Sequence, residues 1–261
     1  MPAVKRTTDS KDFSVKKQDI DRLFTSLAAV IPEPETELEY TNTFTLLVSV
    51  VLSAQATDKS VNEATPALFA LADTPEKMVA LGEDAVRDKI KTIGLFNSKA
   101  KNVIKLSQML IDDYGSEVPA SRGEMQKLPG VGRKTASVVM NEAFGEATIA
   151  VDTHVFRVSN RTRLAPANTA DKVEQKLEKI VPVQWEKGAH HWLILHGRYT
   201  CLARKPKCWE CVIADICPYK PKTPDPETEA LLKAEKKAAG KRKLAPPRPR
   251  KAAKKKAAKR F

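Results

Sequence analysis

Thiol groups are absent from almost the entire chain. Its 261 residues include four cysteines, and all of them lie between residues 201 and 217. The sequence contains no apolar run of about eighteen residues, so no membrane-spanning helix is expected. Residues 1–18 are polar and lack the apolar stretch of a secretory leader, which favours a cytoplasmic location. With four histidines and no cluster of acidic residues, a second metal site is not expected either.

The four cysteines follow the spacing C-x6-C-x2-C-x5-C, at Cys201, Cys208, Cys211 and Cys217. Four soft ligands in one short stretch indicate a single closed metal site, either iron–sulfur or zinc. Disulfides would require an oxidising compartment. Zinc sites usually pair two short knuckles, whereas only one spacer is short here. The irregular spacing therefore favours a [4Fe–4S] cluster, with zinc as the alternative.

Positive charge is concentrated at the C-terminal end. Residues 221–261 contain fifteen Lys and Arg but four Asp and Glu, a net charge of +11 out of +13 for the whole chain. A block of like charge without apolar periodicity is typically disordered and solvated. We expect this tail to be disordered and to attract polyanions without regard to their sequence.

The rest of the chain is predicted to be all-α, because apolar residues recur at helical intervals and continuous β alternation is absent. Proline at 75 after Thr74, and Ser121 three residues before Glu124, are typical of helix starts. Helices are predicted over residues 18–30, 43–53, 133–144, 169–180 and 190–199, of which 43–53 is expected to be buried. Two further helices are predicted to begin after Thr74 and after Ser121.

Two glycines flank Val131 in the sequence Leu128-Pro-Gly-Val-Gly132. Glycine permits positive φ and close approach to the backbone. A helix is predicted to start at Arg133, and free amides at a helix N-terminus bind anions. With Leu128 and Val131 anchored in the core, the amides around Gly130 could hold a phosphate independently of base sequence. An ordinary helix–helix turn would look the same.

The chain resembles the endonuclease III family, the helix–hairpin–helix DNA glycosylases of base excision, in motifs that follow the same order. These are Leu-Pro-Gly-Val-Gly-Arg-Lys-Thr-Ala at 128–136, Val-Asp-Thr-His at 151–154 and the cysteine pattern. Segments 52–58, 93–99 and 190–201 match as well. The resemblance covers about residues 18–220.

The resemblance implies two helical lobes with a DNA cleft between them. A six-helix barrel lobe would span 36–146, with the helix–hairpin–helix at about 122–144, and a [4Fe–4S] cluster lobe would combine 18–35 with 147–220. Residues 1–17 would form a polar extension and 221–261 the basic tail. The implied protein is a cytoplasmic, nucleoid-associated monomer that acts on double-stranded DNA and not on membranes.

The implied activity is that of a bifunctional DNA glycosylase and AP lyase, which removes oxidised pyrimidines from flipped-out nucleotides in duplex DNA. A monofunctional glycosylase and a non-enzymatic iron–sulfur DNA-binding protein are the alternatives. Lys134 would attack the sugar C1′ and form a Schiff base, with Asp152 stabilising the developing positive charge. Partial burial, the helix N-terminus and nearby Arg133 would favour the neutral amine that attack requires.

The resemblance also assigns roles in DNA binding. Gln55 would fill the gap left by the flipped nucleotide, and Leu95, with Ile93, would act as a wedge in the opposite strand. Asp58 and His154 would line the base pocket. The expected phosphate contacts are Gly130, Val131, Gly132, Arg133, Lys99, Arg204 and Lys205, supported by the anchor Leu128.

Overall fold

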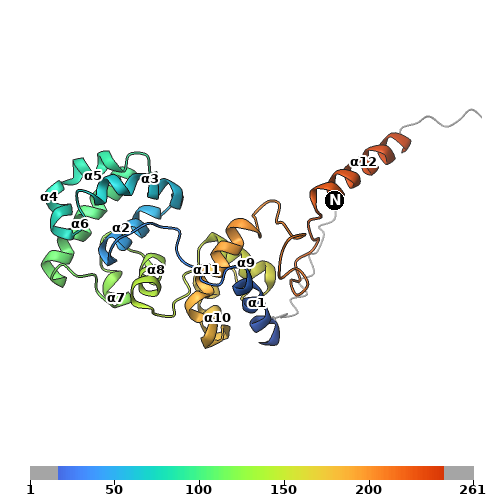
Figure 1. The fold of residues 1–261 in the computed structure, drawn as a ribbon, viewed down its shortest axis with the longest axis horizontal. Helices are drawn as coiled ribbons and strands as arrows, with labels where there is room; N and C mark the ends of the chain where they lie inside the picture. Colours follow the sequence, from blue (N-terminus) through green and yellow to red (C-terminus); the bar gives the residue numbers. More distant parts are fainter. Residues whose placement is uncertain (1–16, 244–261) are drawn as a thin grey trace, which may run out of the picture.

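The computed structural model describes residues 17–243, and every regular element in this range is an α-helix (Figure 1). The predicted all-α class is confirmed. None of the described helices is long and apolar enough to cross a membrane. The helices are α1 Lys17–Val30, α2 Thr43–Ser53, α3 Asp58–Phe69, α4 Pro75–Leu81, α5 Glu83–Lys89, α6 Phe96–Tyr114, α7 Arg122–Met125, α8 Arg133–Phe144, α9 Thr153–Thr162, α10 Ala170–Ile180, α11 Val183–Tyr199 and α12 Pro226–Lys243.

Most helix starts coincide with capping residues that are visible in the sequence. The Thr74 and Thr169 side chains accept hydrogen bonds from backbone N–H groups in the first turns of α4 and α10. Ser121 caps α7 in the same way. The predicted ranges 43–53 and 133–144 coincide with α2 and α8. The prediction for α11 is wrong at its start, because this helix begins at Val183, directly after Pro182, and not at His190.

Two hydrophobic cores divide the described chain into two lobes. The first core is built from α2 to α8 and contains Leu46, Leu106 and Val139. The second is built from α1, α9, α10 and α11 and contains Phe24 and Leu193. We call these the barrel lobe and the cluster lobe. They lie at opposite ends of the body in Figure 1.

The segment between α8 and α9 runs along the boundary between the lobes. Ile149 and Val151 pack into the core of the cluster lobe, whereas Ala150 between them packs into the core of the barrel lobe. Alternation of this kind is what an extended backbone provides. Both lobes therefore fix the backbone directly before Asp152.

The C-terminal tail differs from the prediction of disorder, since Pro226–Lys243 forms α12, which projects away from the body in Figure 1. Asp225 caps this helix by accepting from the N–H groups of Glu227 and Thr228, and Pro226 begins it. Alanine, leucine, glutamate and lysine then supply high helix propensity. Residues 1–16 and 244–261, which include most of the predicted N-terminal extension and the end of the basic tail, lie outside the described residues.

Candidate active site and iron–sulfur centre

The turn between α7 and α8 presents backbone amides at the surface. Gly130 has φ +81°, and a Cβ there would lie 2.9 Å from Nδ2 of Asn102, so a side chain would strain the turn. Gly132 occupies the N-cap position of α8, but glycine has no side chain to accept a hydrogen bond there. No side chain therefore caps the first N–H groups of the helix. Leu128 and Val131 are buried in the core of the barrel lobe. The N–H group of Val131, expected at a phosphate, instead donates to the carbonyl oxygen of Leu128 at 3.1 Å. The turn therefore combines a buried base with two exposed glycines, Gly130 and Gly132.

Lys134 and Asp152 line one cavity whose walls come from both lobes. Lys134 lies in the first turn of α8, in the barrel lobe, and Asp152 directly precedes α9, in the cluster lobe. The expected partial burial of Lys134 is wrong: the residue is exposed, and the buried part of α8 begins only at Thr135. The relative position of the two side chains depends on how the lobes pack.

Asp152 is held by the helix that it caps. Its Oδ1 accepts hydrogen bonds from the backbone N–H groups of His154 and Val155, each at 2.8 Å. A carboxylate at a helix N-terminus is also stabilised by the helix dipole. Because both bonds use Oδ1, the cap leaves Oδ2 available. The side chain can therefore cap α9 and face the cavity at the same time.

A second carboxylate, Asp58, lines the same cavity at the start of α3. Burial raises the pKa of Asp58, while the nearby Lys134 ammonium lowers it and Asp152 raises it further. Arg198 of α11 lies with Nη1 2.8 Å from Oδ2 of Asp58 and also contacts Glu37. Sequence reasoning missed Arg198 and Glu37, because their roles depend on segments far apart in the chain.

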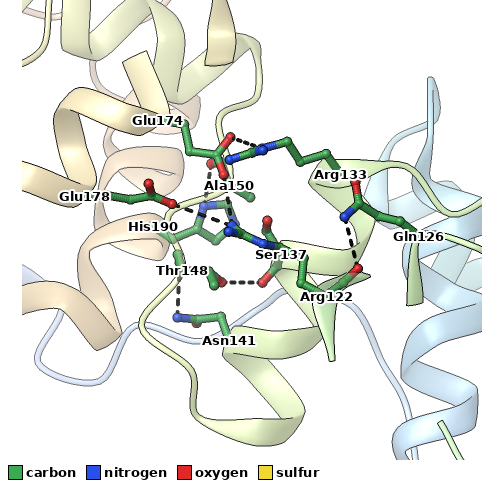
Figure 2. Close-up of polar contacts among 10 residues, drawn as sticks. All are labelled: Arg122, Gln126, Arg133, Ser137, Asn141, Thr148, Ala150, Glu174, Glu178 and His190. Atoms are coloured by element: carbon green, nitrogen blue, oxygen red, sulfur yellow. Dashed lines mark hydrogen bonds and ion pairs between the residues drawn. The ribbon is translucent and has the colours of Figure 1, made fainter. Parts of the chain in front are cut away.

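His190 forms part of the cavity wall and fixes the backbone near Asp152. Its Nδ1 lies 2.8 Å from the carbonyl oxygen of Ala150 (Figure 2), and the side chain is buried. Burial lowers the pKa of His190 to about 3, and His191 and Lys134 lower it too. The imidazole is therefore neutral near pH 7 and donates its Nδ1–H to Ala150. His154, in contrast, is not among the residues lining this cavity and lies 3.2 Å from Arg157.

Gln55 and Leu95 lie on neighbouring loops at the edge of the barrel lobe. Both are exposed and adopt positive φ, +56° and +62°, which is costly for residues with a side chain. The loops are close, since a Cβ on Gly94 would lie 3.7 Å from the carbonyl oxygen of Gln55. Strained, exposed residues of this kind are typical of functional sites. Ile93 is 1 % exposed in the barrel core, so the structure contradicts the wedge role expected for it.

Two basic residues that were expected to contact DNA phosphates are instead paired with a carboxylate or buried. Arg133 donates through Nε to Glu174 of α10 at 2.9 Å (Figure 2), so its charge is already paired. Lys99 is 5 % exposed and its Nζ has no hydrogen-bond partner among the described residues. Burial lowers the pKa of Lys99. Neither side chain presents a free charge at the surface.

Arg204 and Lys205 are exposed on the loop between the first two cysteines. Lys205 lies 3.4 Å from Glu229 of α12. Arg161 of α9 holds this loop by donating hydrogen bonds to the carbonyl oxygens of Leu202 and Ala203, each at 2.6 Å. The loop is therefore fixed on the cluster lobe with its cationic side chains outward.

The four cysteines line a single cavity beside α9 and α11, and none forms a disulfide. Burial raises the pKa of the Cys211 thiol to about 11, a hydrogen bond from Ile213 opposes this, and the other cysteines add to it. Thiolates gathered here need a bound cation to neutralise them. Within residues 17–243, no three His, Cys, Asp or Glu side chains are placed to hold a single metal ion. Four thiols on the walls of one shared cavity match the ligand type and number of an iron–sulfur cluster.

The comparisons agree with this geometry. The family model described as "HhH-GPD superfamily base excision DNA repair protein" matches residues 48–183, and that of the "Iron-sulfur binding domain of endonuclease III" matches residues 201–217. The fold and the hairpin thus define a helix–hairpin–helix base-excision DNA repair protein that carries an iron–sulfur domain.

Individual relatives narrow this class. The chain is 55 % identical over 200 residues to endonuclease III of Escherichia coli (strain K12) and 56 % identical over 200 residues to that of Haemophilus influenzae, covering 77 % of this chain and 95 % of each relative. The structure of a trapped endonuclease III–DNA covalent intermediate superposes with a TM-score of 0.74 at 44 % identity, over 77 % of this chain and 95 % of that one. The chain belongs to the endonuclease III family. It is a DNA glycosylase and AP lyase of base-excision repair with a [4Fe–4S] cluster.

Proposed function

We propose that the enzyme excises oxidised pyrimidines from duplex DNA with Lys134 as nucleophile and Asp152 as its electrostatic partner. The observation that carries this proposal is that the two side chains, from different lobes, line the same cavity. Incubation with a duplex containing one thymine glycol should give strand scission beside the lesion. Release of the base without scission would instead support a monofunctional glycosylase.

The chemistry follows from the residues in the cavity. The unprotonated Lys134 amine attacks C1′ of the extruded sugar, and the bond to the base breaks with its electron pair leaving on the base. The C1′–O4′ bond then breaks with its electron pair on O4′, which takes up the proton released from the amine nitrogen, and an iminium ion between Lys134 and C1′ remains. Loss of a C2′ proton then expels the 3′ phosphate by β-elimination. Glu35, Glu37, Asp58 and Asp152 all line the cavity with Lys134. We assign the acceptance of its proton to Asp152 or Asp58, since the charges of Lys134 and Asp152 both act on Asp58.

Asp152 contributes by charge as well as by proton transfer. Breaking the bond to the base leaves positive charge on the sugar, and a fixed carboxylate stabilises that charge without having to reorganise. Two backbone hydrogen bonds and the buried residues Ala150 and Val151 hold Asp152 in place. Its position therefore does not depend on DNA binding.

DNA is held by the turn and opened by the strained loops. The amides of Gly130 and Gly132 and the free N-terminus of α8 bind a phosphate, which brings the sugar next to Lys134. Leu95 enters the stack on the opposite strand, and Gln55 occupies the space of the extruded nucleotide. Arg204 and Lys205 attract the backbone on the cluster lobe.

The four cysteines hold the cluster, which supplies no bond-breaking chemistry in this scheme. With a cluster bound to these thiolates, the loop of residues 201–217 would be fixed at four points, which would stabilise the cluster lobe. The loop between Cys201 and Cys208 would then present Arg204 and Lys205 in fixed positions.

The substitution Asp152→Asn separates the two roles of Asp152, which are to cap α9 and to provide a negative charge for the reaction. Asparagine caps helices as well as aspartate does, so the thermal midpoint Tm should change by less than about 2 °C. Loss of the negative charge should lower the single-turnover rate of strand scission by at least about 100-fold. Asp152→Ala is the matched comparison, because it also removes the cap and should cost about 1 kcal/mol of stability. Scission by Asp152→Asn at the rate of the unsubstituted enzyme would exclude a role for the carboxylate.

The two glycines of the turn should respond differently to alanine. Gly130→Ala forces a side chain into positive φ and against Asn102, and should destabilise the protein by about 1–3 kcal/mol. Gly132 has negative φ, and a Cβ at this position would have no neighbouring atom within 4 Å, so Gly132→Ala should cost only about 0.5–1 kcal/mol, the cost of a poorer N-cap. Its methyl group would instead meet the DNA phosphate and weaken binding by roughly tenfold. Chemical denaturation and DNA titration measure the two effects, and unimpaired DNA binding by Gly132→Ala would place the phosphate elsewhere.

A further inference from the structure

A buried carboxylate connects the two lobes beside the hairpin. Glu174, on α10 of the cluster lobe, is 4 % exposed, and two arginines of the barrel lobe reach it. Arg133 Nε lies 2.9 Å from Oε2 of Glu174, and Arg122 Nη1 lies 3.4 Å from Oε1 (Figure 2). A buried carboxylate is costly unless it is paired in this way. The buried charge on the cluster lobe is therefore balanced by arginines of the barrel lobe.

The two arginines hold both ends of the hairpin. Arg122 is the first residue of α7 and Arg133 the first residue of α8, so the DNA-binding turn lies between them. Glu178, one turn further along α10, contacts Arg122 at 3.6 Å. Since Glu174 is shared, it fixes the whole helix–hairpin–helix against the cluster lobe.

The contact of Glu174 with Arg133 and Arg122 lies next to the proposed nucleophile. Lys134 follows Arg133 directly in the first turn of α8, whereas Asp152 belongs to the cluster lobe, where α9 packs against α10. A second set of contacts lies along the segment that joins the lobes: Thr148 donates to the Ser137 carbonyl, and Asn141 donates to that of Thr148 (Figure 2). The position of the amine relative to the carboxylate is thus set by contacts between the lobes. The charged ones include the pair of Arg198 with Asp58 and the pairs of Glu174, and it is Glu174 that holds the hairpin.

We propose that Glu174 is a positioning residue for the lyase reaction: by holding Arg133 and Arg122 across the lobe boundary, it places the Lys134 amine for attack on the sugar. The proposal rests on Lys134 being the nucleophile. It also assigns Arg133 a role different from phosphate binding, because the guanidinium charge is paired with Glu174. A shift of about 1 Å in a reacting group can cost roughly 100-fold in rate.

The test is borohydride trapping under single-turnover conditions with a duplex that contains one abasic site. Glu174→Gln keeps the shape of the side chain and removes its charge. We expect the trapping rate to fall by about 10- to 100-fold, while the Kd for a duplex with an uncleavable abasic analogue does not weaken. Glu178→Gln is the matched control on the same helix and should trap within about twofold of the unsubstituted rate.

A second variant covers the case in which Glu174→Gln folds poorly. Arg133→Gln removes a half-exposed side chain and leaves Glu174 paired with Arg122, so it should fold and show the same loss of rate with retained affinity. Tm and bound iron confirm the folded state of each variant. A trapping rate equal to that of the unsubstituted enzyme in both variants would overturn the proposal, and so would a slower rate explained entirely by weaker DNA binding. Trapping by Lys134→Ala, measured in parallel, would instead overturn the nucleophile itself.

Discussion

Lys134→Ala should abolish covalent trapping of the enzyme on abasic DNA and reduce strand scission by at least about 1,000-fold. Removal of the amine eliminates the Schiff base, and the other cavity residues, Asp58, Asp152 and His190, offer no amine in its place. DNA affinity should remain measurable, since the turn amides and Leu95 are unchanged. Borohydride trapping and a DNA titration on the same preparation measure the two quantities.

Lys127→Ala is the matched control for this experiment. Lys127 lies in the same hairpin motif, but its ammonium is exposed and pairs with Glu124 at 2.7 Å, outside the cavity. Its removal should leave trapping within about twofold, because exposed ion pairs contribute little. Equal trapping by Lys134→Ala and Lys127→Ala would show that a different amine reacts.

Cys211→Ala should remove bound iron and sulfide and unfold the cluster lobe. The four thiols line one cavity, and the loop of residues 201–217 contains no regular helix of its own, so its order depends on what the thiols bind. Iron and acid-labile sulfide per chain, visible absorbance and Tm should all fall together. The barrel lobe, which has a separate core, should keep much of its helical circular dichroism.

Cys211→Ser provides a graded comparison, because a serine oxygen is a poorer ligand for iron than a thiolate but preserves the size of the side chain. It should retain less iron than the unsubstituted protein and more than Cys211→Ala. Stoichiometric zinc in place of iron in the native protein would contradict the assignment of the site. So would full stability of Cys211→Ala without any bound metal.

Local structure was largely predictable from the sequence because its signals are local. Thr74, Ser121 and Thr169 cap helices where expected, and the apolar run 43–53 is the buried α2. The prediction of disorder was wrong for residues 226–243. It rested on the block of positive charge and gave too little weight to the residues that start a helix. The Asp225-Pro226 start was visible in the sequence and could have identified α12.

The site was predictable only as far as its motifs reach. Lys134, Asp152 and the four cysteines belong to recognisable patterns. Arg198 and Glu174 do not, because each acts on residues that are distant in sequence and adjacent only after the lobes pack. The burial of Ile93 and Lys99 could not be inferred for the same reason: the motif around Leu95 does not show which of its side chains turn toward the core.

The central claim is that the Lys134 amine forms the covalent bond to the sugar of the extruded nucleotide. Peptide mass spectrometry of the borohydride-reduced complex with abasic DNA tests it most directly, since reduction fixes the adduct to the residue that reacted. We expect the deoxyribose-derived mass on the peptide that contains Lys134. An adduct on any other lysine, or on the N-terminal amine, would contradict the account.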